Sequence, residues 1–193
     1  MSDPHPNPLP TRTDLSDGVV LLRQPVEADV PAITAGASEP SVARYTTVPS
    51  PYEESDAIWF VDEVRNTWQA GTAATFAVCN AAEPHTLLGM VGLHNIELAG
   101  DPGGLAEIGY WLSTPARGHG LMSRAVRLLS AWGVDELGLA RIDWVAAVGN
   151  CASRNVVEHC GYKFEGTIRL GMKQRGRRID AWVGGLLATE LIR

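Results

Sequence analysis

The stretch from Glu107 to Trp132 limits what this 193-residue chain can fold into more than any other part of it. Residues 105–112 are apolar and aromatic without a helical stripe, which predicts a strand. From Gly120 onward, apolar residues recur at three- and four-residue steps, which predicts a helix with one buried face. The strand therefore turns into the helix among glycines, where the first N–H groups of the helix have no partner. A helix start of this kind binds phosphate readily.

Two common phosphate-binding motifs do not fit the connection at residues 117–120, which reads Arg-Gly-His-Gly. A P-loop ends in Gly-Lys-Ser/Thr, but the last glycine here is followed by Leu121. The dinucleotide-binding fingerprint needs a third Gly or Ala, where this chain has Ser123. It also needs an acidic residue about twenty positions later, and Asp135 and Glu136 come too early, at the end of the same helix.

A third motif fits the same residues better. The coenzyme A loop of the GNAT acetyltransferases has the pattern Arg/Gln-x-x-Gly-x-Gly/Ala. Residues 117–122 resemble it, and only Met122 departs, at the last position. Arg117 would add a planar cation beside the helix start. Taken alone, these six residues leave open the alternative that the glycines only permit a tight turn.

Composition excludes several other classes of protein. The length suits one domain, and 20% charged with 45% hydrophobic residues is ordinary for a globular protein. The net charge of -6 argues against a nucleic-acid surface. No apolar run reaches the length of a membrane span, and the first residues lack the hydrophobic centre of a signal peptide. Cys79, Cys151 and Cys160 have no metal-type spacing, so we expect reduced thiols, no bound metal and a cytoplasmic protein.

The remaining pattern predicts an arm followed by one domain. Residues 1–16 contain four prolines among polar residues and are expected to be a flexible arm, and residues 17–193 are expected to form a single domain. Strands are predicted over residues 19–22, 75–79, 87–93, 105–112, 142–146, 164–172 and 179–187, and helices over 27–35, 53–69, 120–138 and directly after Asn150. In the second of these helices the residues that share one face are Ile58, Val61, Val64 and Trp68.

The lengths of the connections predict how two pairs of strands run. The polar segment 80–86 is short, so the strands on either side of it should be antiparallel. A full helix separates the strand at 105–112 from the strand at 142–146, so these two should be parallel.

A second motif extends the resemblance to the GNAT family. Asn150-x-x-Ser153, followed by Gly161-Tyr162, is similar to the family's ending Asn-x-x-Ala/Ser…Gly-Phe/Tyr. The segments that resemble the branch of ribosomal-protein (Rim-type) N-terminal acetyltransferases are Leu22–Pro25, Arg44–Thr46, Glu107–Leu112 and Arg117–Gly120. The resemblance covers roughly residues 17–190.

This resemblance implies a fold and a co-substrate. The fold would be α/β, with a mixed, mostly antiparallel sheet that splays at a central parallel strand pair and is flanked by helices. Acetyl-coenzyme A would lie between the two parallel strands, without a metal. Backbone of Tyr110, Trp111 and Leu112 would pair with the pantetheine arm, and Asn150 would bind that arm from the other side. The expected pyrophosphate cradle comprises Arg117, Gly118, His119, Gly120, Leu121, Met122 and Ser123.

The resemblance also suggests catalytic residues, with one departure. Many GNAT enzymes have a Tyr that protonates the leaving thiolate at the position of Val157. Ser153 is the nearest candidate to replace it, or it could simply satisfy the helix start. Glu107 is the expected general base, acting directly or through water, or it could be structural. Alternation of side chains puts Glu107 on the same sheet face as the indole of Trp111, which would raise its pKa.

The expected reaction is direct attack by a protein N-terminal α-amine on acetyl-coenzyme A in a ternary complex. An α-amine has a pKa about 2.4 units below that of lysine, so it costs roughly 3 kcal/mol less to deprotonate at neutral pH. The alternatives are a small amine acceptor of aminoglycoside or polyamine type, and a non-catalytic module that binds coenzyme A. No nucleic acid or membrane partner is expected, and a homodimer is possible. The basic turn at residues 173–178 could be merely solvated or could contact phosphate or substrate.

Overall fold

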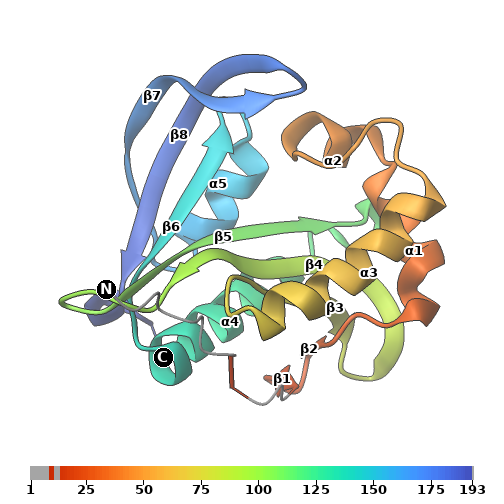
Figure 1. Ribbon diagram of the computed structural model, residues 1–193, viewed down its shortest axis with the longest axis horizontal. Coiled ribbons are helices and arrows are strands. Elements are labelled where there is room, and N and C mark those ends of the chain that lie inside the picture. The colour runs from red at the N-terminus through yellow and green to blue at the C-terminus, as the bar shows by residue number, and fades with distance from the viewer. Residues whose placement is uncertain (1–8, 11–13, 193) are drawn as a thin grey trace.

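The computed structural model describes residues 9–10 and 14–192. In it one eight-stranded sheet runs through the molecule in the order β1-β2-β3-β4-β5-β6-β8-β7 (Figure 1). The strands are β1 Leu15–Ser16, β2 Val20–Arg23, β3 Ala74–Asn80, β4 Glu83–Glu97, β5 Gly104–Leu112, β6 Leu139–Ala147, β7 Lys163–Gln174 and β8 Arg177–Leu187. The mixed α/β architecture confirms the fold class expected from the sequence.

The β5·β6 pair at the centre is parallel, and all other neighbouring pairs are antiparallel. Its register runs from Gly104 opposite Leu139 to Ile108 opposite Trp144, and there the recorded pairing stops. Both strands continue beyond that point, β5 to Leu112 and β6 to Ala147. Their carboxyl-terminal ends therefore part, which leaves backbone N–H and C=O groups without a partner strand. This is the splay expected from the sequence.

Helix α4 (Leu121–Leu137) makes the crossover between the two parallel strands. Glycines at both of its ends adopt left-handed backbone, Gly120 with φ 73° and Gly138 with φ 67°. Residues without a Cβ are favoured in this conformation, and it stops the helix sharply at each end. The buried positions of α4, Met122, Ala125, Val126, Leu129 and Trp132 among them, join the larger core cluster on one face of the sheet.

The other face is covered by α1 (Val30–Ala37), which follows a short 3₁₀ turn (Glu27–Asp29), and by α3 (Glu54–Gln69). Between α1 and α3 in the chain comes α2 (Pro40–Tyr45), which the sequence did not predict. The face predicted for α3 is wrong at Ile58, which is 50% exposed, because Ala57 takes the buried position instead. Helix α5 (Cys151–Glu158) packs against β6 and α4. Two further 3₁₀ turns are Thr114–Ala116 and Ala188–Glu190.

The connection between β3 and β4 is shorter than predicted. Only residues 81–82 form the turn, and Asn80 pairs directly with Glu83, so most of the polar segment is strand. The final hairpin is confirmed and is longer than predicted at its tip, where Gln174 pairs with Arg177 across a two-residue turn.

The predicted N-terminal arm lies partly outside the described residues. In its described part Leu9 is only 5% exposed within the core cluster, and the carbonyl of Pro10 accepts a hydrogen bond from Trp68 Nε1 at 3.2 Å. Leu15 and Ser16 form β1, which pairs with β2. Among the helices that the structure describes, none has the length and hydrophobicity to cross a membrane.

Candidate active site

The predicted cradle lies where β5 passes into α4. Gly118 and Gly120 both have positive φ, 83° and 73°, and a Cβ added at either would meet no atom within 4 Å. The backbone here is therefore open to solvent on the side of the missing side chains. For the N–H groups of residues 118–123, no acceptor is recorded among the residues that the structure describes. This combination of space and unpaired donors at the start of a 17-residue helix suits an anion.

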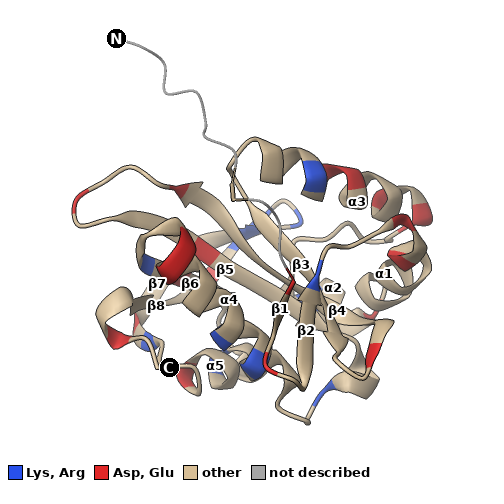
Figure 2. Ribbon diagram, turned by 90° about the horizontal axis from the view of Figure 1, so that it is seen from below, with Lys and Arg blue, Asp and Glu red and all other residues tan. Residues whose placement is uncertain are grey.

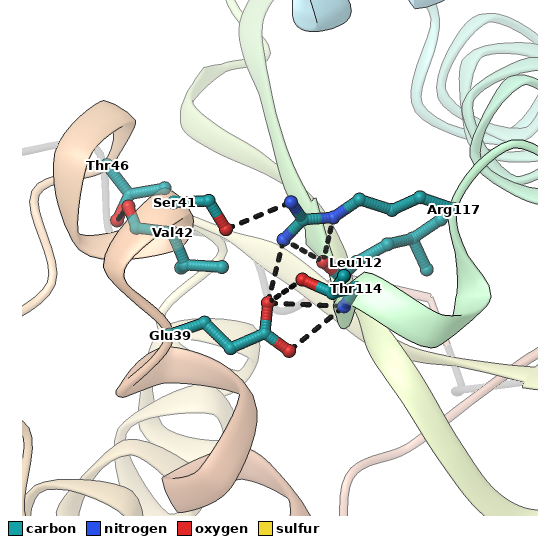
Figure 3. A network of polar contacts seen from close by, with 7 residues as sticks. All are labelled: Glu39, Ser41, Val42, Thr46, Leu112, Thr114 and Arg117. Carbon is teal, nitrogen blue, oxygen red and sulfur yellow. Dashed lines mark hydrogen bonds and ion pairs between the residues drawn. The ribbon is translucent and has the colours of Figure 1, made fainter.

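Arg117 contacts protein groups with all three of its guanidinium nitrogens (Figure 3). Nε and Nη2 donate to the carbonyl of Leu112 at 2.8 and 2.7 Å, and Nη1 donates to Ser41 Oγ at 2.9 Å. Nη2 also forms an ion pair with Glu39 at 3.0 Å. In this geometry the guanidinium holds the cradle onto the start of α2, and it is not a free cation beside the helix start as the sequence suggested.

Glu39, the N-cap residue of α2, completes this network (Figure 3). Its carboxylate accepts hydrogen bonds from the backbone N–H of Thr114 at 2.9 Å and from the Thr114 hydroxyl at 2.6 Å. Partial burial acts to raise the pKa of Glu39, but the bonds from Thr114 and the charge of Arg117 outweigh it and hold that pKa below its usual value. The carboxylate therefore stays ionised and keeps its partners at neutral pH.

Three polar side chains meet just beyond the point where β5 and β6 part. Ser153 Oγ accepts from Trp144 Nε1 at 3.0 Å and lies 3.0 Å from the hydroxyl of Tyr110. The Tyr110 hydroxyl also donates to the carbonyl of Ser153 at 2.8 Å. When the Tyr110 hydrogen serves that carbonyl, the hydrogen of Ser153 points to the Tyr110 oxygen. The network joins β5, β6 and α5, and burial raises the pKa of Tyr110 well above its ordinary value.

The start of α5 is capped by Asn150, whose Oδ1 accepts from the backbone N–H of Ser153 at 3.2 Å. The helix-start role that the sequence left open for the Ser153 hydroxyl therefore belongs to Asn150. Val157, at the position where many GNAT enzymes have a Tyr, is 1% exposed within the core. Its place inside the core explains why an apolar residue suits this position.

Glu107 lies in a row of titratable residues across three adjacent strands. It pairs with His94 of β4 on one side and with Asp143 of β6 on the other. Burial, and then the charge of Asp143, raise the pKa of Glu107 above its usual value. The direction is the one expected, but the cause differs, because the sequence attributed it to Trp111. Burial lowers the pKa of His94, whose ring lies against Gly92 and Gly109.

Asp143 is itself held by Arg141, whose Nε donates to Oδ1 at 2.5 Å. The two terminal nitrogens of Arg141 bind Glu165 at 2.8 and 2.7 Å. The cation thus neutralises charge on the side of the row that faces β8, and Glu107 has no such partner in the described chain. A carboxylate that is half-buried, near a second carboxylate and without a cation is suited to accept a proton.

Trp111 points to the same face as Glu107 but packs elsewhere. Its indole lies against α1, where a Cβ at Gly36 would overlap the ring. It also lines a cavity of about 240 Å³ between α1, α3 and the segment that joins α2 to α3. The other lining residues are Ile33, Ala37, Thr47, Val48, Pro49, Tyr52, Asp56, Trp59 and Phe60. Burial and the charge of Asp56 raise the pKa of Tyr52 to about 12, so its phenol is neutral.

The family described as "Acetyltransferase (GNAT) domain" matches residues 20–163, which is most of the chain. The chain belongs to the GNAT acetyltransferase family.

Relatives of this GNAT protein bear names that agree with that assignment. YdaF of Bacillus subtilis (strain 168), provisionally assigned as a ribosomal N-acetyltransferase, is 38% identical over 105 residues, which are 54% of this chain and 56% of that protein. The chain thus spans about half the length of this relative. An uncharacterized N-acetyltransferase of Bacillus licheniformis, p20, is 29% identical over 153 residues, 79% of this chain and 84% of that protein.

Solved structures of the same fold include two Rim-type enzymes. RimJ of Mycobacterium smegmatis, in complex with CoA-disulfide, gives a TM-score of 0.81 at 20% identity and covers 94% of this chain and 88% of its own. RimL, a ribosomal L7/L12 alpha-N-protein acetyltransferase in complex with coenzyme A, gives 0.77 at 20% identity, with 88% and 94% covered. These matches establish the fold.

Three residues of the candidate site could not be found from the sequence alone. Asp143 and His94 flank Glu107 only because of strand register, and no local pattern marks them. Glu39 reaches Arg117 from 78 residues away. For Tyr110, the resemblance implied a role for the backbone and none for the hydroxyl. Alternation along β5 could have revealed it, since it places Tyr110 on the face opposite Glu107.

Proposed function

We propose that this GNAT enzyme transfers the acetyl group of acetyl-coenzyme A to the N-terminal α-amine of a protein. The observation that carries the proposal is the parting of β5 and β6. The open cradle lies at the end of β5, and Glu107 lies on the sheet face opposite Tyr110. A ligand with amide groups can use the backbone groups that the splay leaves without a partner strand. The acceptor amine would then approach from the face of Glu107 and attack the thioester directly, in a ternary complex.

The chain offers a distinct set of groups to each part of the co-substrate. The N–H groups of residues 118–123 would bind the pyrophosphate, and the open space beside Gly118 and Gly120 fits that role. Backbone of Tyr110 to Leu112 would pair with the pantetheine arm. The Oδ1 of Asn150 caps α5, so its Nδ2 is the group that would donate a hydrogen bond to the arm. When bound, acetyl-coenzyme A supplies an activated thioester.

Glu107 would accept a proton from the attacking amine, directly or through one water. Its raised pKa suits this role, because a base works best when its pKa approaches the working pH. On the other face, the hydroxyls of Ser153 and Tyr110 lie together where the leaving thiolate would form. One of them would donate a hydrogen bond to the sulfur, and a shift of the Ser153 hydrogen away from Tyr110 is enough to provide it.

The cavity beside Trp111 supports a peptide acceptor. It opens on the face of Glu107 and is lined by aromatic and aliphatic side chains, with the carboxylate of Asp56 among them. Such a lining would take the first side chain of a polypeptide while its amine reaches Glu107. An α-amine is also the easier acceptor for a site with one carboxylate base, by roughly 3 kcal/mol relative to lysine at neutral pH. The provisional assignment of YdaF and the activity in RimL's name agree with this choice.

An acceptor screen tests the proposal. The full chain and acetyl-coenzyme A would be incubated with peptides that have a free N-terminus, with N-terminally blocked lysine peptides, and with aminoglycosides and polyamines. Mass spectrometry would locate any added acetyl group. We expect acetylation of free N-termini, with kcat/KM at least tenfold above that of blocked lysine peptides. Faster acetylation of the small amines would contradict the proposal, and slow loss of acetyl-coenzyme A with every amine would favour a binding module instead.

A further inference from the structure

The tip of the β7–β8 hairpin carries four exposed cations, Lys173, Arg175, Arg177 and Arg178. Within the described part of the chain none of them forms an ion pair. The carboxylate of Asp180 nearby accepts from the backbone N–H of Leu170 instead. The net charge of the whole protein is -6, and the charged residues of α3 are mostly acidic (Figure 2). The positive charge is therefore local and unneutralised.

The turn itself does not favour this sequence. Arg175 has φ 45° and Gly176 has φ 76°, so both central residues adopt left-handed backbone. Hairpin turns of this type prefer Asn or Asp before the glycine, because a longer side chain is strained at positive φ. An Arg at this position adds strain as well as repulsion between cations. A turn that only needed to be solvated would be served better by Asn-Gly.

The tip is also attached to the candidate acceptor side. Gln174 Nε2 donates to the carbonyls of Arg44 and Thr46 at 2.8 and 3.0 Å, and Arg175 Nη2 donates to the carbonyl of Val48 at 3.4 Å. Val48 lines the cavity that also contains Trp111. Figure 1 likewise places the hairpin tip beside α2. The four cations therefore stand at the edge of the site that would receive the acceptor.

The distance from the row of Glu107 to the hairpin tip matches the length of a short extended peptide. Gly185 of β8 pairs with Asp143, so it belongs to the row of Glu107. Arg177 lies about eight residues from Gly185 along the same strand, which corresponds to roughly 26 Å. An extended polypeptide with its amine at Glu107 would reach the tip at about its eighth residue.

We propose that the four cations at the hairpin tip, here called the basic tip, bind an acidic segment of the acceptor polypeptide, about six to ten residues after its N-terminus. This inference rests on the proposed function, because it assumes that the acceptor is a polypeptide. Opposite charges at the rim of an interface mainly steer the encounter and select the partner. The basic tip would thus choose among N-termini that the apolar cavity accepts equally well.

Steady-state kinetics with two matched peptides test the docking. Both have twelve residues and the same first five; residues 6–10 are glutamates in one and glutamines in the other. We expect the acidic peptide to have a kcat/KM about tenfold higher at low ionic strength, through KM and with kcat unchanged. The difference should vanish at about 0.5 M salt, where exposed charges are screened. Equal kcat/KM values for the two peptides at low salt would overturn the docking and leave the proposed function intact.

Two variants that each remove two cations assign the preference to the tip. Arg175→Asn/Arg177→Gln should abolish the preference for the acidic peptide, and its turn should be no less stable because Asn suits positive φ. The control Arg65→Gln/Lys163→Gln removes two exposed cations that are paired elsewhere, and it should keep the preference. If the tip variant instead raises KM for acetyl-coenzyme A, the cations contact the cofactor's phosphates and the proposal is wrong.

A binding measurement separates docking from chemistry. The acidic peptide, N-acetylated and fluorescently labelled, cannot be turned over, and its binding is measured by anisotropy with the full chain. Binding that the tip variant weakens about tenfold, in a protein that acetylates no peptide, would support the docking and contradict the proposed function. A single-stranded oligonucleotide that displaces this peptide at a concentration lower than the unlabelled acidic peptide would overturn the proposal in favour of a nucleic-acid surface.

Discussion

Glu107 owes its properties to its neighbours in the sheet more than to its place in the sequence. In the row His94–Glu107–Asp143, Glu107 lies between a partly buried imidazole and a second carboxylate. Arg141 pairs with Asp143 and Glu165 and not with Glu107, whose pKa stays raised. At the scale of single residues, three substitutions test what this row and the Ser153 network do.

Glu107→Gln should lower kcat on the order of 10²-fold at neutral pH and leave the Kd for acetyl-coenzyme A unchanged. The loss should shrink at high pH, where the free amine forms without a base. The variant should be at least as stable as the wild type at pH 7. Because the folded pKa of Glu107 lies above its unfolded value, its ionisation costs stability as pH rises, and glutamine avoids that cost. Wild-type kcat at neutral pH would exclude Glu107 as the base.

Asp143→Asn should shift the acidic limb of the kcat/KM profile to lower pH. The charge of Asp143 raises the pKa of Glu107, so its removal lets Glu107 ionise at lower pH, and the freed Arg141 acts in the same direction. Glu165→Gln is the control, since it removes the other partner of Arg141 and leaves Asp143 in place. An acidic limb that stays put in Asp143→Asn would mean that burial alone sets the pKa of Glu107.

Ser153→Ala should lower kcat at least tenfold while the Kd for acetyl-coenzyme A changes little, because the hydroxyl would serve the leaving thiolate. It also removes the acceptor of Trp144 Nε1, so unfolding should become about 1–3 kcal/mol easier. Tyr110→Phe removes the Tyr110 hydroxyl from Ser153 and keeps the bond from Trp144, so it separates the loss of kcat from the loss of stability. A Ser153→Ala protein with lower stability but unchanged kcat per folded molecule would assign the serine to structure only.

At the scale of elements, the crossover from β5 through α4 to β6 organises the site. The same helix is bounded by two glycines in matching left-handed conformations, with open space around each. Only Gly120 lies at the end with unpaired N–H groups. Substitutions at Gly120 and Gly138 therefore distinguish the effect of backbone strain from the loss of anion binding.

Gly120→Asp should weaken acetyl-coenzyme A binding at least 100-fold in calorimetry, because it adds bulk and negative charge where the pyrophosphate would lie. Gly138→Asp is the matched control: it imposes similar backbone strain, φ 67° against 73°, at the other end of α4. It should lower Tm to a similar extent and leave the affinity unchanged. Equal affinity in both variants would mean that residues 118–123 are not the cradle.

At the scale of the whole molecule, α2 ties the two sides of the splay together. Its start is bound through Glu39 and Ser41 to Arg117 in the cradle, and its end is bound through the carbonyls of Arg44 and Thr46 to the β7–β8 hairpin. The candidate cofactor side and acceptor side thus share one short helix. A further long-range contact is made by residues near the N-terminus, where Leu9 packs into the core.

Leu9→Ala should destabilise the protein by about 2 kcal/mol, because it removes a side chain that is 5% exposed and leaves a cavity. For a chain of this length that corresponds to a fall in Tm of roughly 4–8 °C in calorimetry. Leu98→Ala, at a position that is 41% exposed, is the control and should change Tm by no more than about 2 °C. Identical Tm values for the two variants would show that Leu9 contributes no packing energy.

The sequence by itself determined the elements whose signals are local. Apolar periodicity identified α4, the glycines marked its ends, and the lengths of the connections decided which strands are parallel, because a hairpin cannot join parallel strands. The glycines of the motif at residues 117–122 predicted the turn from β5 into α4, since its geometry depends on adjacent residues alone. Only the tertiary structure decided what surrounds each side chain. Register placed Asp143 beside Glu107, and the fold brought Glu39 to Arg117 and the basic tip to α2. Such contacts join residues far apart in the chain, and their electrostatics depend on burial, which no local pattern encodes.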